Sequence, residues 1–197
     1  MIFTFKNSTD WFTIIKLASS DQEYFNAVKN KDKETINRML KEKASFSGYT
    51  VGPVYHGTEK FNITEFFGGW WSTEKKVTEE FGSICYTALL KGDFATGEDL
   101  RKLYIEFNGS DIDPDSDYEF SDSELGDEAM SGGPFSRFVQ ESGKNGIQVW
   151  DESNRESGIS YAIFRPNQVK LSGVTYDDSK VIPLSKRFDS NSDDIRY

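Results

Sequence analysis

The sequence is poor in residues that bind metals or form disulfides: its 197 residues include one histidine and one cysteine. Cys85 therefore has no partner for a disulfide within the chain, and a zinc site of four thiolates is excluded. With His56 as the only histidine, an H-E-x-x-H zinc motif is impossible. The sequence also lacks the G-x-x-x-x-G-K-S/T loop that binds nucleotide phosphates. We therefore expect neither a metal site nor a phosphate-binding loop of this type.

Long hydrophobic runs and a surplus of positive charge are absent as well. Polar residues interrupt the apolar ones near the N-terminus, which predicts neither a secretory signal nor a membrane-spanning helix. We expect a cytoplasmic protein without a membrane partner. The formal net charge is −10, so the chain repels phosphate backbones, and direct nucleic-acid binding is not expected. The negative charge would suit a basic partner protein, but a net charge that only keeps the protein soluble explains the composition equally well.

The N-terminal quarter of the chain carries helical patterns. Asp21 is placed to cap a helix that runs through Val28. Asp32 is placed to cap a second helix, whose apolar residues recur at three- and four-residue spacing up to Ala44. These patterns predict a helical arm over residues 1–48. Residues 49–185 are then assigned to one domain, and the polar residues 186–197 are expected to form a tail.

The central domain is rich in short strand patterns separated by glycine-containing turns. Strands are predicted at 51–55, 70–71, 84–89, 103–107, 147–150, 160–164 and within 169–176. A helix capped by Ser72 or Thr73 and ended by Gly82 is predicted after the second strand, and another helix begins at Pro134. The acidic, turn-rich residues 108–133 are predicted to form a surface loop. Many short strands without regular β-α-β alternation favour an α+β fold.

Two short motifs carry residues with binding chemistry. His56 ends the first strand and is followed by Gly57, which lets a ligand approach the backbone. Trp70 and Trp71 precede a helix, so they offer an aromatic face beside amides that favour polar or negative groups. Neighbouring strand residues point to opposite faces, so at most one tryptophan faces a given pocket. Each motif also has a structural interpretation, as a packed histidine or as two core tryptophans.

Three segments together resemble the ADP-ribosyltransferases. They are YHGT at residues 55–58, GWWST at 69–73 followed by a helix, and SYAIFRPNQVK at 160–170. Their order and spacing are similar to those of the diphtheria-toxin and poly(ADP-ribose) polymerase lineage, and within it to the transferase domain of phage and prophage polyvalent proteins. The resemblance covers about residues 49–197. It implies a split antiparallel β-sheet core with a few flanking helices.

The resemblance also implies a site for NAD, which such enzymes use as a substrate. His56 would hydrogen-bond the ribose hydroxyls, and Gly57 would hold the nicotinamide amide through its backbone. The ring of Trp70 or Trp71 would stack on the nicotinamide. The other cofactor-binding residues that the resemblance implies are Thr58, Ser72, Thr78 and Phe81.

One position departs from the family pattern. In the polymerase-like branch a glutamate begins the strand that corresponds to residues 160–164, whereas this chain has Ser160 there. Serine supplies no carboxylate to stabilise the positive charge that develops in the reaction. Another acid from the preceding segment would then supply it: Glu156 is the first choice, ahead of Asp151 and Glu152. Alternatively, the reaction needs no carboxylate at this position, or the domain has lost catalysis.

The sequence therefore leads to the hypothesis of an NAD-dependent mono-ADP-ribosyltransferase, of the glycosyltransferase class, with His56, Glu156 and Ser160 as catalytic residues. By resemblance, it would be encoded by a phage or prophage and would modify an unidentified protein, such as a host factor, in the host cytoplasm. The alternative is a catalytically inactive module of the same fold, which binds NAD or a partner protein through its acidic surface.

Overall fold

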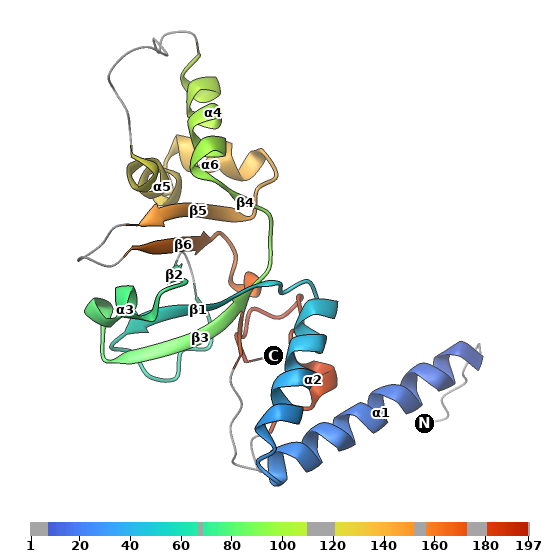
Figure 1. Ribbon diagram of the computed structural model, residues 1–197. Coiled ribbons are helices and arrows are strands. Elements are labelled where there is room, and N and C mark those ends of the chain that lie inside the picture. Colours follow the sequence, from blue (N-terminus) through green and yellow to red (C-terminus); the bar gives the residue numbers. More distant parts are fainter. Residues whose placement is uncertain (1–7, 67–68, 110–120, 152–156, 173–180, 197) are drawn as a thin grey trace.

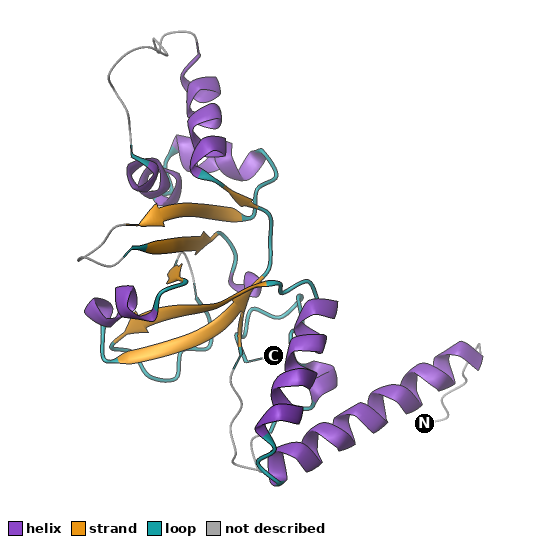
Figure 2. Ribbon diagram, viewed as in Figure 1, coloured by secondary structure: helices purple, strands orange, loops and turns teal. Residues whose placement is uncertain are grey.

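The computed structural model describes residues 8–66, 69–109, 121–151, 157–172 and 181–196. They form an α+β fold in which helices flank a seven-stranded sheet (Figure 1 and Figure 2). The helices are α1 (Ser8–Lys29), α2 (Lys33–Phe46), α3 (Lys75–Thr78), α4 (Gly97–Asn108), α5 (Asp122–Met130) and α6 (Pro134–Glu141). The strands are β1 (Val51–Thr58), β2 (Trp70–Ser72), β3 (Ile84–Leu90), β4 (Phe94–Ala95), β5 (Gly146–Asp151), β6 (Gly158–Ile163) and β7 (Val169–Leu171). Short 3-10 turns lie at Glu79–Phe81, Pro166–Gln168 and Leu184–Lys186.

The sheet is mixed, with the strand order β4-β5-β6-β2-β1-β3-β7. Neighbouring strands run antiparallel except β4 and β5, which are parallel. The expectation of an antiparallel sheet is therefore wrong at this edge, where the two-residue β4 gave no strand pattern in the sequence. The short β2 joins the two halves of the sheet, pairing with β6 along its length and with β1 through Tyr55 and Ser72.

Buried side chains form three clusters around this sheet. One joins α1 and α2 to residues 184–188, one fills the centre of the sheet around Trp71, and one lies between β5 and the helices α4, α5 and α6. In Figure 1 these three helices stack beyond β5, at the opposite end of the molecule from α2, while α1 extends away from the sheet. The middle of the molecule, between the helical ends, is therefore where strands from both halves meet.

Two helices form where the sequence predicts them near the N-terminus. Asp32 caps α2, since its carboxylate accepts a hydrogen bond from Thr35 N at 3.1 Å. The prediction that Asp21 caps a helix is wrong, because α1 begins at Ser8 and Asp21 lies inside it. Its carboxylate instead accepts hydrogen bonds from Ser185 N at 2.7 Å and Ser185 Oγ at 2.6 Å. This contact joins α1 to the C-terminal part of the chain.

The strand predicted at residues 103–107 is wrong, because those residues belong to α4. Leu103, Ile105 and Phe107 alternate as in a strand, but Leu103 and Phe107 also continue a helical spacing that starts at Leu100. Leu100 is fully buried in the third cluster, whereas Ile105 is exposed. The burial of one helical face decided between the two periodicities.

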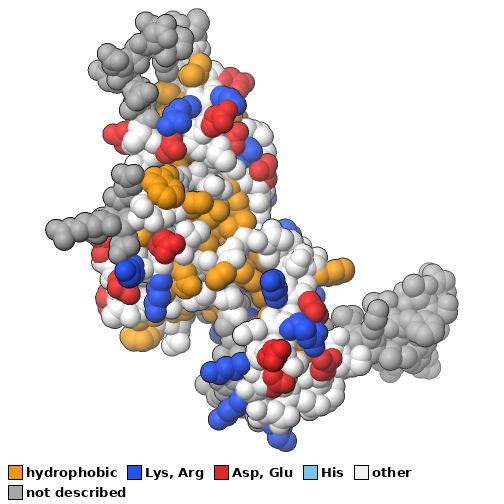
Figure 3. Space-filling model, viewed as in Figure 1, with side chains coloured by type: hydrophobic (Ala, Val, Ile, Leu, Met, Phe, Trp, Pro, Cys, Tyr) orange, Lys and Arg blue, Asp and Glu red, His pale blue; other side chains and the backbone are white. Residues whose placement is uncertain are grey.

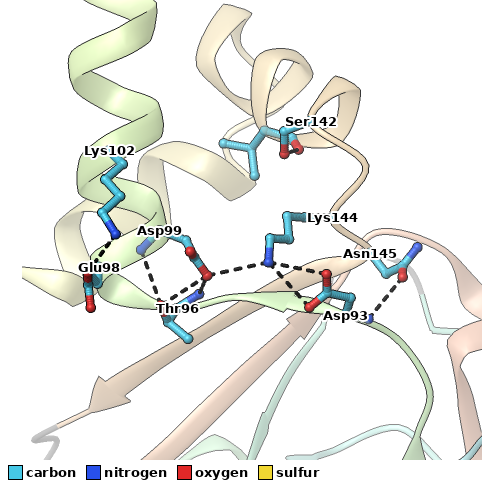
Figure 4. Close-up of polar contacts among 9 residues, drawn as sticks. Asp93, Thr96, Glu98, Asp99, Lys102, Ser142, Lys144 and Asn145 are labelled. Carbon is cyan, nitrogen blue, oxygen red and sulfur yellow. Dashed lines mark hydrogen bonds and ion pairs between the residues drawn. The ribbon is translucent and has the colours of Figure 1, made fainter.

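The first turn of α4 is fixed to β4 and β5. Thr96 and Asp99 form a capping box, in which each side chain bonds the backbone N–H of the other. Lys144 Nζ, just before β5, lies 3.5 Å from Asp99 Oδ2 and 3.3 Å from Asp93 Oδ2 (Figure 4). Asn145 Oδ1 accepts a hydrogen bond from Asp93 N at 3.0 Å. These contacts hold the parallel edge of the sheet against the helices.

The surface loop predicted at 108–133 is also wrong in part, because α5 occupies residues 122–130. Ser121 and Glu124 form a second capping box before this helix. Leu125 and Ala129 then bury one face of α5 against β5. The first part of the predicted loop, 110–120, lies outside the described residues.

Residues 186–196, predicted to be a polar tail, pack against the rest of the structure. Phe188 is 2% exposed in the first cluster, and Ile195 is fully buried in the second. Lys170 Nζ donates to Ser192 O at 2.6 Å and to Asp194 O at 2.7 Å. The segment is therefore anchored to the fold through Phe188 and Ile195, despite its polar composition.

The face shown in Figure 3 has hydrophobic side chains mainly in its middle, beside a few charged ones. Figure 3 shows side chains of both charges over the helices at either end, with hydrophobic side chains between them. Among the large hydrophobic residues that are exposed are Phe46, Phe61, Phe81 and Trp150. Within the part of the chain that the structure describes, no helix is both long and apolar enough to cross a membrane.

Candidate functional site

A cavity of about 540 Å³ is lined by residues of β1, β2, β5 and β6 together with α3 and α5. Its volume is within the range of small-molecule sites, and such sites commonly combine an apolar lining with a few polar groups. The strands belong to both halves of the sheet, so the cavity lies at the junction that β2 makes between them.

His56, near the end of β1, is held in one orientation at this junction. Its Nδ1 lies 2.8 Å from Trp70 O, and because a carbonyl only accepts, Nδ1 carries a proton. In the neutral ring Nε2 then presents a lone pair. The ring packs against Phe66 and Trp71, with centroid distances of 4.7 Å and 5.2 Å. Burial lowers the pKa of His56, and the hydrogen bond to Trp70 O opposes this only in part. The favoured form at neutral pH is thus a hydrogen-bond acceptor.

The two tryptophans of β2 differ in their surroundings, as their alternation predicts. Trp71 is fully buried in the central cluster, and its Nε1–H has no acceptor among the described residues. Trp70 is partly exposed and lines the cavity. A Cβ added to Gly126 of α5 would lie 3.2 Å from the ring of Trp70, so the backbone of this helix packs closely against the ring. Trp70 is therefore the tryptophan that faces the cavity, and Trp71 packs against the ring of His56.

A close backbone contact sets the part of the cavity formed by α3. A Cβ on Gly57 would lie 1.8 Å from Thr78 O, so β1 and α3 come this close only because residue 57 is glycine. Thr78 is buried, and its Oγ1 donates to Lys75 O at 2.7 Å. Gly57 therefore positions Thr78 beside the cavity.

The helix predicted after Ser72 is present but starts later and is shorter. Ser72 and Thr73 are not its caps: Glu74 is the N-cap residue, and Ser72 Oγ accepts a hydrogen bond from Glu74 N at 3.1 Å. The helical turn ends in a 3-10 segment before Gly82, as predicted for that glycine. Phe81, the last residue of this segment, is 61% exposed and lines the cavity. An aromatic ring is therefore available at the cavity for contact with a flat group.

Ser160 lies on β6, where it pairs with Ser72 on one side and Val149 on the other. It is 3% exposed, and its Oγ donates to Asp151 Oδ2 at 3.0 Å. Asp151 lies two residues beyond Val149 on β5, so both side chains are on the same face of the sheet. A carboxylate therefore reaches the Ser160 position from the neighbouring strand.

Negative charge dominates the cavity. Asp127 of α5 and Asp151 of β5 both line it, and no lysine or arginine does so among the described lining residues. His56 is the remaining ionisable side chain in the described lining, and burial favours its neutral form. Two carboxylates in a described lining without lysine or arginine favour positive charge on a group bound there.

The structure brings together most of the residues that the sequence selected. Seven of them line the cavity: His56, Gly57, Trp70, Ser72, Thr78, Phe81 and Ser160. Thr58 and Trp71 do not line it; Thr58 Oγ1 accepts a hydrogen bond from Lys60 N at 3.2 Å instead. Glu156, the first choice for a catalytic acid, lies outside the described residues.

Sequence reasoning missed the contribution of α5. Ser123 and Asp127 line the cavity from this helix, four residues apart and so on one face. The S-x-x-E capping box at Ser121 was the signal that could have revealed the helix. Gly69, Val77 and Val149 also line the cavity; they flank the recognised motifs and carry no chemical signal of their own.

A second cavity, of about 570 Å³, lies beside the end of α2 and is lined by residues that include Lys43, Phe46 and Arg187. It contains none of the residues that the sequence motifs selected. We therefore take the cavity around His56 as the candidate site.

Comparison with known proteins adds no assignment. No family model matches the chain, and neither a curated protein nor a solved structure matches it.

Proposed function

We propose that this chain is an NAD-dependent mono-ADP-ribosyltransferase that modifies a protein. The observation that carries the proposal is the convergence of seven residues, selected from three separate sequence segments, on the single cavity around His56. The third segment lies far from the first two in the chain, and the likeness of all three to the ADP-ribosyltransferases is a property of the sequence alone, independent of any cavity. Such a convergence supports the interpretation of the motifs as one binding site.

The geometry suits a ligand with hydroxyl groups and a flat ring. His56 Nε2 offers an acceptor to a ribose hydroxyl, because Nδ1 is committed to Trp70 O. The faces of Trp70 and Phe81 offer stacking surfaces to a ring of nicotinamide size. The carboxylates of the cavity favour the positive charge that develops at the ribose carbon when nicotinamide departs.

The remaining features of the proposal rest on the resemblance. It implies that the strands correspond to the split sheet of the ADP-ribosyltransferases, and that the gene belongs to a phage or prophage. It also implies that the acceptor is a host protein, in the host cytoplasm. The net charge of −10 supports a basic acceptor protein over a nucleic acid.

Labelled NAD tests this proposal directly. The purified chain is incubated with NAD labelled in its ADP-ribose part, with and without a bacterial lysate, and we measure NAD binding, nicotinamide release and protein-bound label. We expect all three in the wild type and at least about tenfold weaker binding in His56→Ala, which removes a hydrogen bond and a packed ring. Thr58→Ala is the matched control: it changes a neighbour on β1 that does not line the cavity, so binding should stay unchanged.

The outcomes separate the alternatives. A folded wild-type chain that does not bind NAD would refute the assignment. Binding without nicotinamide release or label would favour the alternative of an inactive NAD-binding module, for which Ser160 at the expected glutamate position is the specific observation.

A further inference from the structure

We infer that Asp151 is the catalytic carboxylate of the cavity around His56. The inference rests on the proposed function and selects, from the acids that the sequence offered, one that was ranked behind Glu156. Asp151 is the last residue of β5, it lines the cavity, and its Oδ2 accepts the hydrogen bond of Ser160 Oγ at 3.0 Å. The carboxylate thus occupies the place beside β6 where the resemblance requires an acid and the sequence has a serine.

Ser160 fixes the orientation of this carboxylate. Ser160 is almost completely buried between Ser72 and Val149, and Asp151 Oδ2 is the acceptor of its hydroxyl. With Oδ2 of Asp151 accepting that hydrogen bond, Oδ1 has no partner among the described residues. One oxygen is therefore held by Ser160, and the other makes no hydrogen bond within the described part of the chain.

Asp127 is the other carboxylate that lines the cavity, and its surroundings differ. It lies on the exposed side of α5, and no hydrogen bond or ion pair holds it among the described residues. Water and salt screen an exposed charge much more than a partly buried one. Asp151 is partly buried and oriented, so its charge acts more strongly on a reacting atom.

The reaction gives Asp151 two tasks. The bond between the ribose anomeric carbon and the nicotinamide nitrogen breaks, and its electron pair leaves on nicotinamide, which becomes neutral. The carboxylate stabilises the positive charge that grows on the carbon. A lone pair of the acceptor then forms the new bond to that carbon, and the acceptor proton passes to Asp151 and on to solvent. With water as the acceptor, the same steps hydrolyse NAD.

The test compares Asp151→Asn with the wild type in the full chain. Asparagine keeps the size of the side chain and an oxygen for Ser160 but removes the charge. We expect NAD binding within about threefold of the wild type and a fall in nicotinamide release of about 100-fold or more, as for loss of one preorganised electrostatic group. Asp127→Asn and Glu156→Gln each remove one competing carboxylate, and we expect each to lower nicotinamide release much less than Asp151→Asn does.

Two further variants guard against a folding defect in Asp151→Asn, which circular dichroism would reveal. Asp151→Glu keeps the charge and should retain more activity than Asp151→Asn. Ser160→Ala keeps the Asp151 carboxylate but removes the hydrogen bond that orients it. This variant should lower nicotinamide release by about tenfold with unchanged NAD binding. Full activity in folded Asp151→Asn, or loss of activity in Glu156→Gln alone, would overturn the inference while leaving the proposed function intact. A wild-type chain that binds no NAD, or that binds NAD without releasing nicotinamide, would overturn the proposed function and this inference together.

Discussion

Replacing Gly57 with alanine obstructs the contact that joins β1 to α3. The added Cβ would lie 1.8 Å from Thr78 O and 2.9 Å from Thr78 C. Carbon atoms in proteins pack at about 3.5–4.0 Å, so the two segments would have to separate by well over an ångström. Because the obstacle is a backbone carbonyl, no side-chain rotation relieves it.

The size of the effect follows from this rigidity. Overpacking a well-packed region destabilises proteins by about 1–3 kcal/mol. Because the backbone carbonyl cannot move aside, we expect Gly57→Ala to lower the free energy of unfolding by about 2–3 kcal/mol. For a chain of this length each kcal/mol lowers Tm by about 2–4 °C, so we expect a fall of about 4–12 °C. The shift of α3 also displaces Thr78 and Phe81, so NAD binding should weaken by at least about tenfold.

Thermal unfolding and equilibrium dialysis with NAD measure the two effects. Gly69→Ala is the matched control, since it adds a methyl group to the same cavity but meets its nearest atoms at ordinary distances of 3.5 Å and more. We expect its Tm to change by less than about 2 °C, because the added methyl group makes only ordinary van der Waals contacts. If Gly57→Ala unfolds within about 1 °C of the wild type, less than the shift that 1 kcal/mol produces, the close approach of β1 and α3 is refuted.

Two further predictions concern pH. Burial lowers the pKa of His56 below its unfolded value, so the unfolded chain binds the proton more readily and the free energy of unfolding should fall as pH drops below about 6.5. Urea unfolding of the wild type and His56→Gln from pH 7.5 to 5 checks this, and equal slopes would contradict it. Burial also lowers the pKa of Lys170 to about 8. Between pH 8 and 9.5 the unfolding free energy should therefore rise by about 1–2 kcal/mol more in the wild type than in Lys170→Met; a matching rise in Lys170→Met would refute the shift.

Local signals in the sequence predicted the elements that position His56 and Trp70. Strand alternation marked β1, β3, β5 and β6, and Pro134 marked the start of α6, as the structure confirms. The opposite facing of Trp70 and Trp71 followed from strand geometry alone. These features depend on neighbours within a few residues, which is why the sequence carried them.

The errors arose where two local patterns competed or a distant contact decided. Leu103 fits both a strand and a helix, and only its packing against the third cluster, together with Leu100, selects the helix. Asp21 has the composition of a cap but bonds Ser185, 164 positions away. The polar composition of residues 186–196 also concealed Ile195, which supports the central cluster. Such contacts cannot be read from a window of sequence.

The pairing of β5 with β6 shows how a carboxylate can lie beside Ser160 although the motif on β6 contains none. Ser160 pairs directly with Val149, and Asp151 lies two residues after Val149 on the same strand. Paired residues, and residues two apart on a strand, point to the same face of a sheet, so the side chains of Asp151 and Ser160 lie on one face. If the proposal holds, Asp151 on β5 supplies the carboxylate that Ser160 on β6 lacks, without any change in the fold. A motif search along one strand finds only the serine, because the acid is nine residues earlier in sequence and becomes its neighbour only through strand pairing. Asp151→Asn compared with Glu156→Gln therefore also decides whether the catalytic acid belongs to the segment that precedes β6 or to the neighbouring strand.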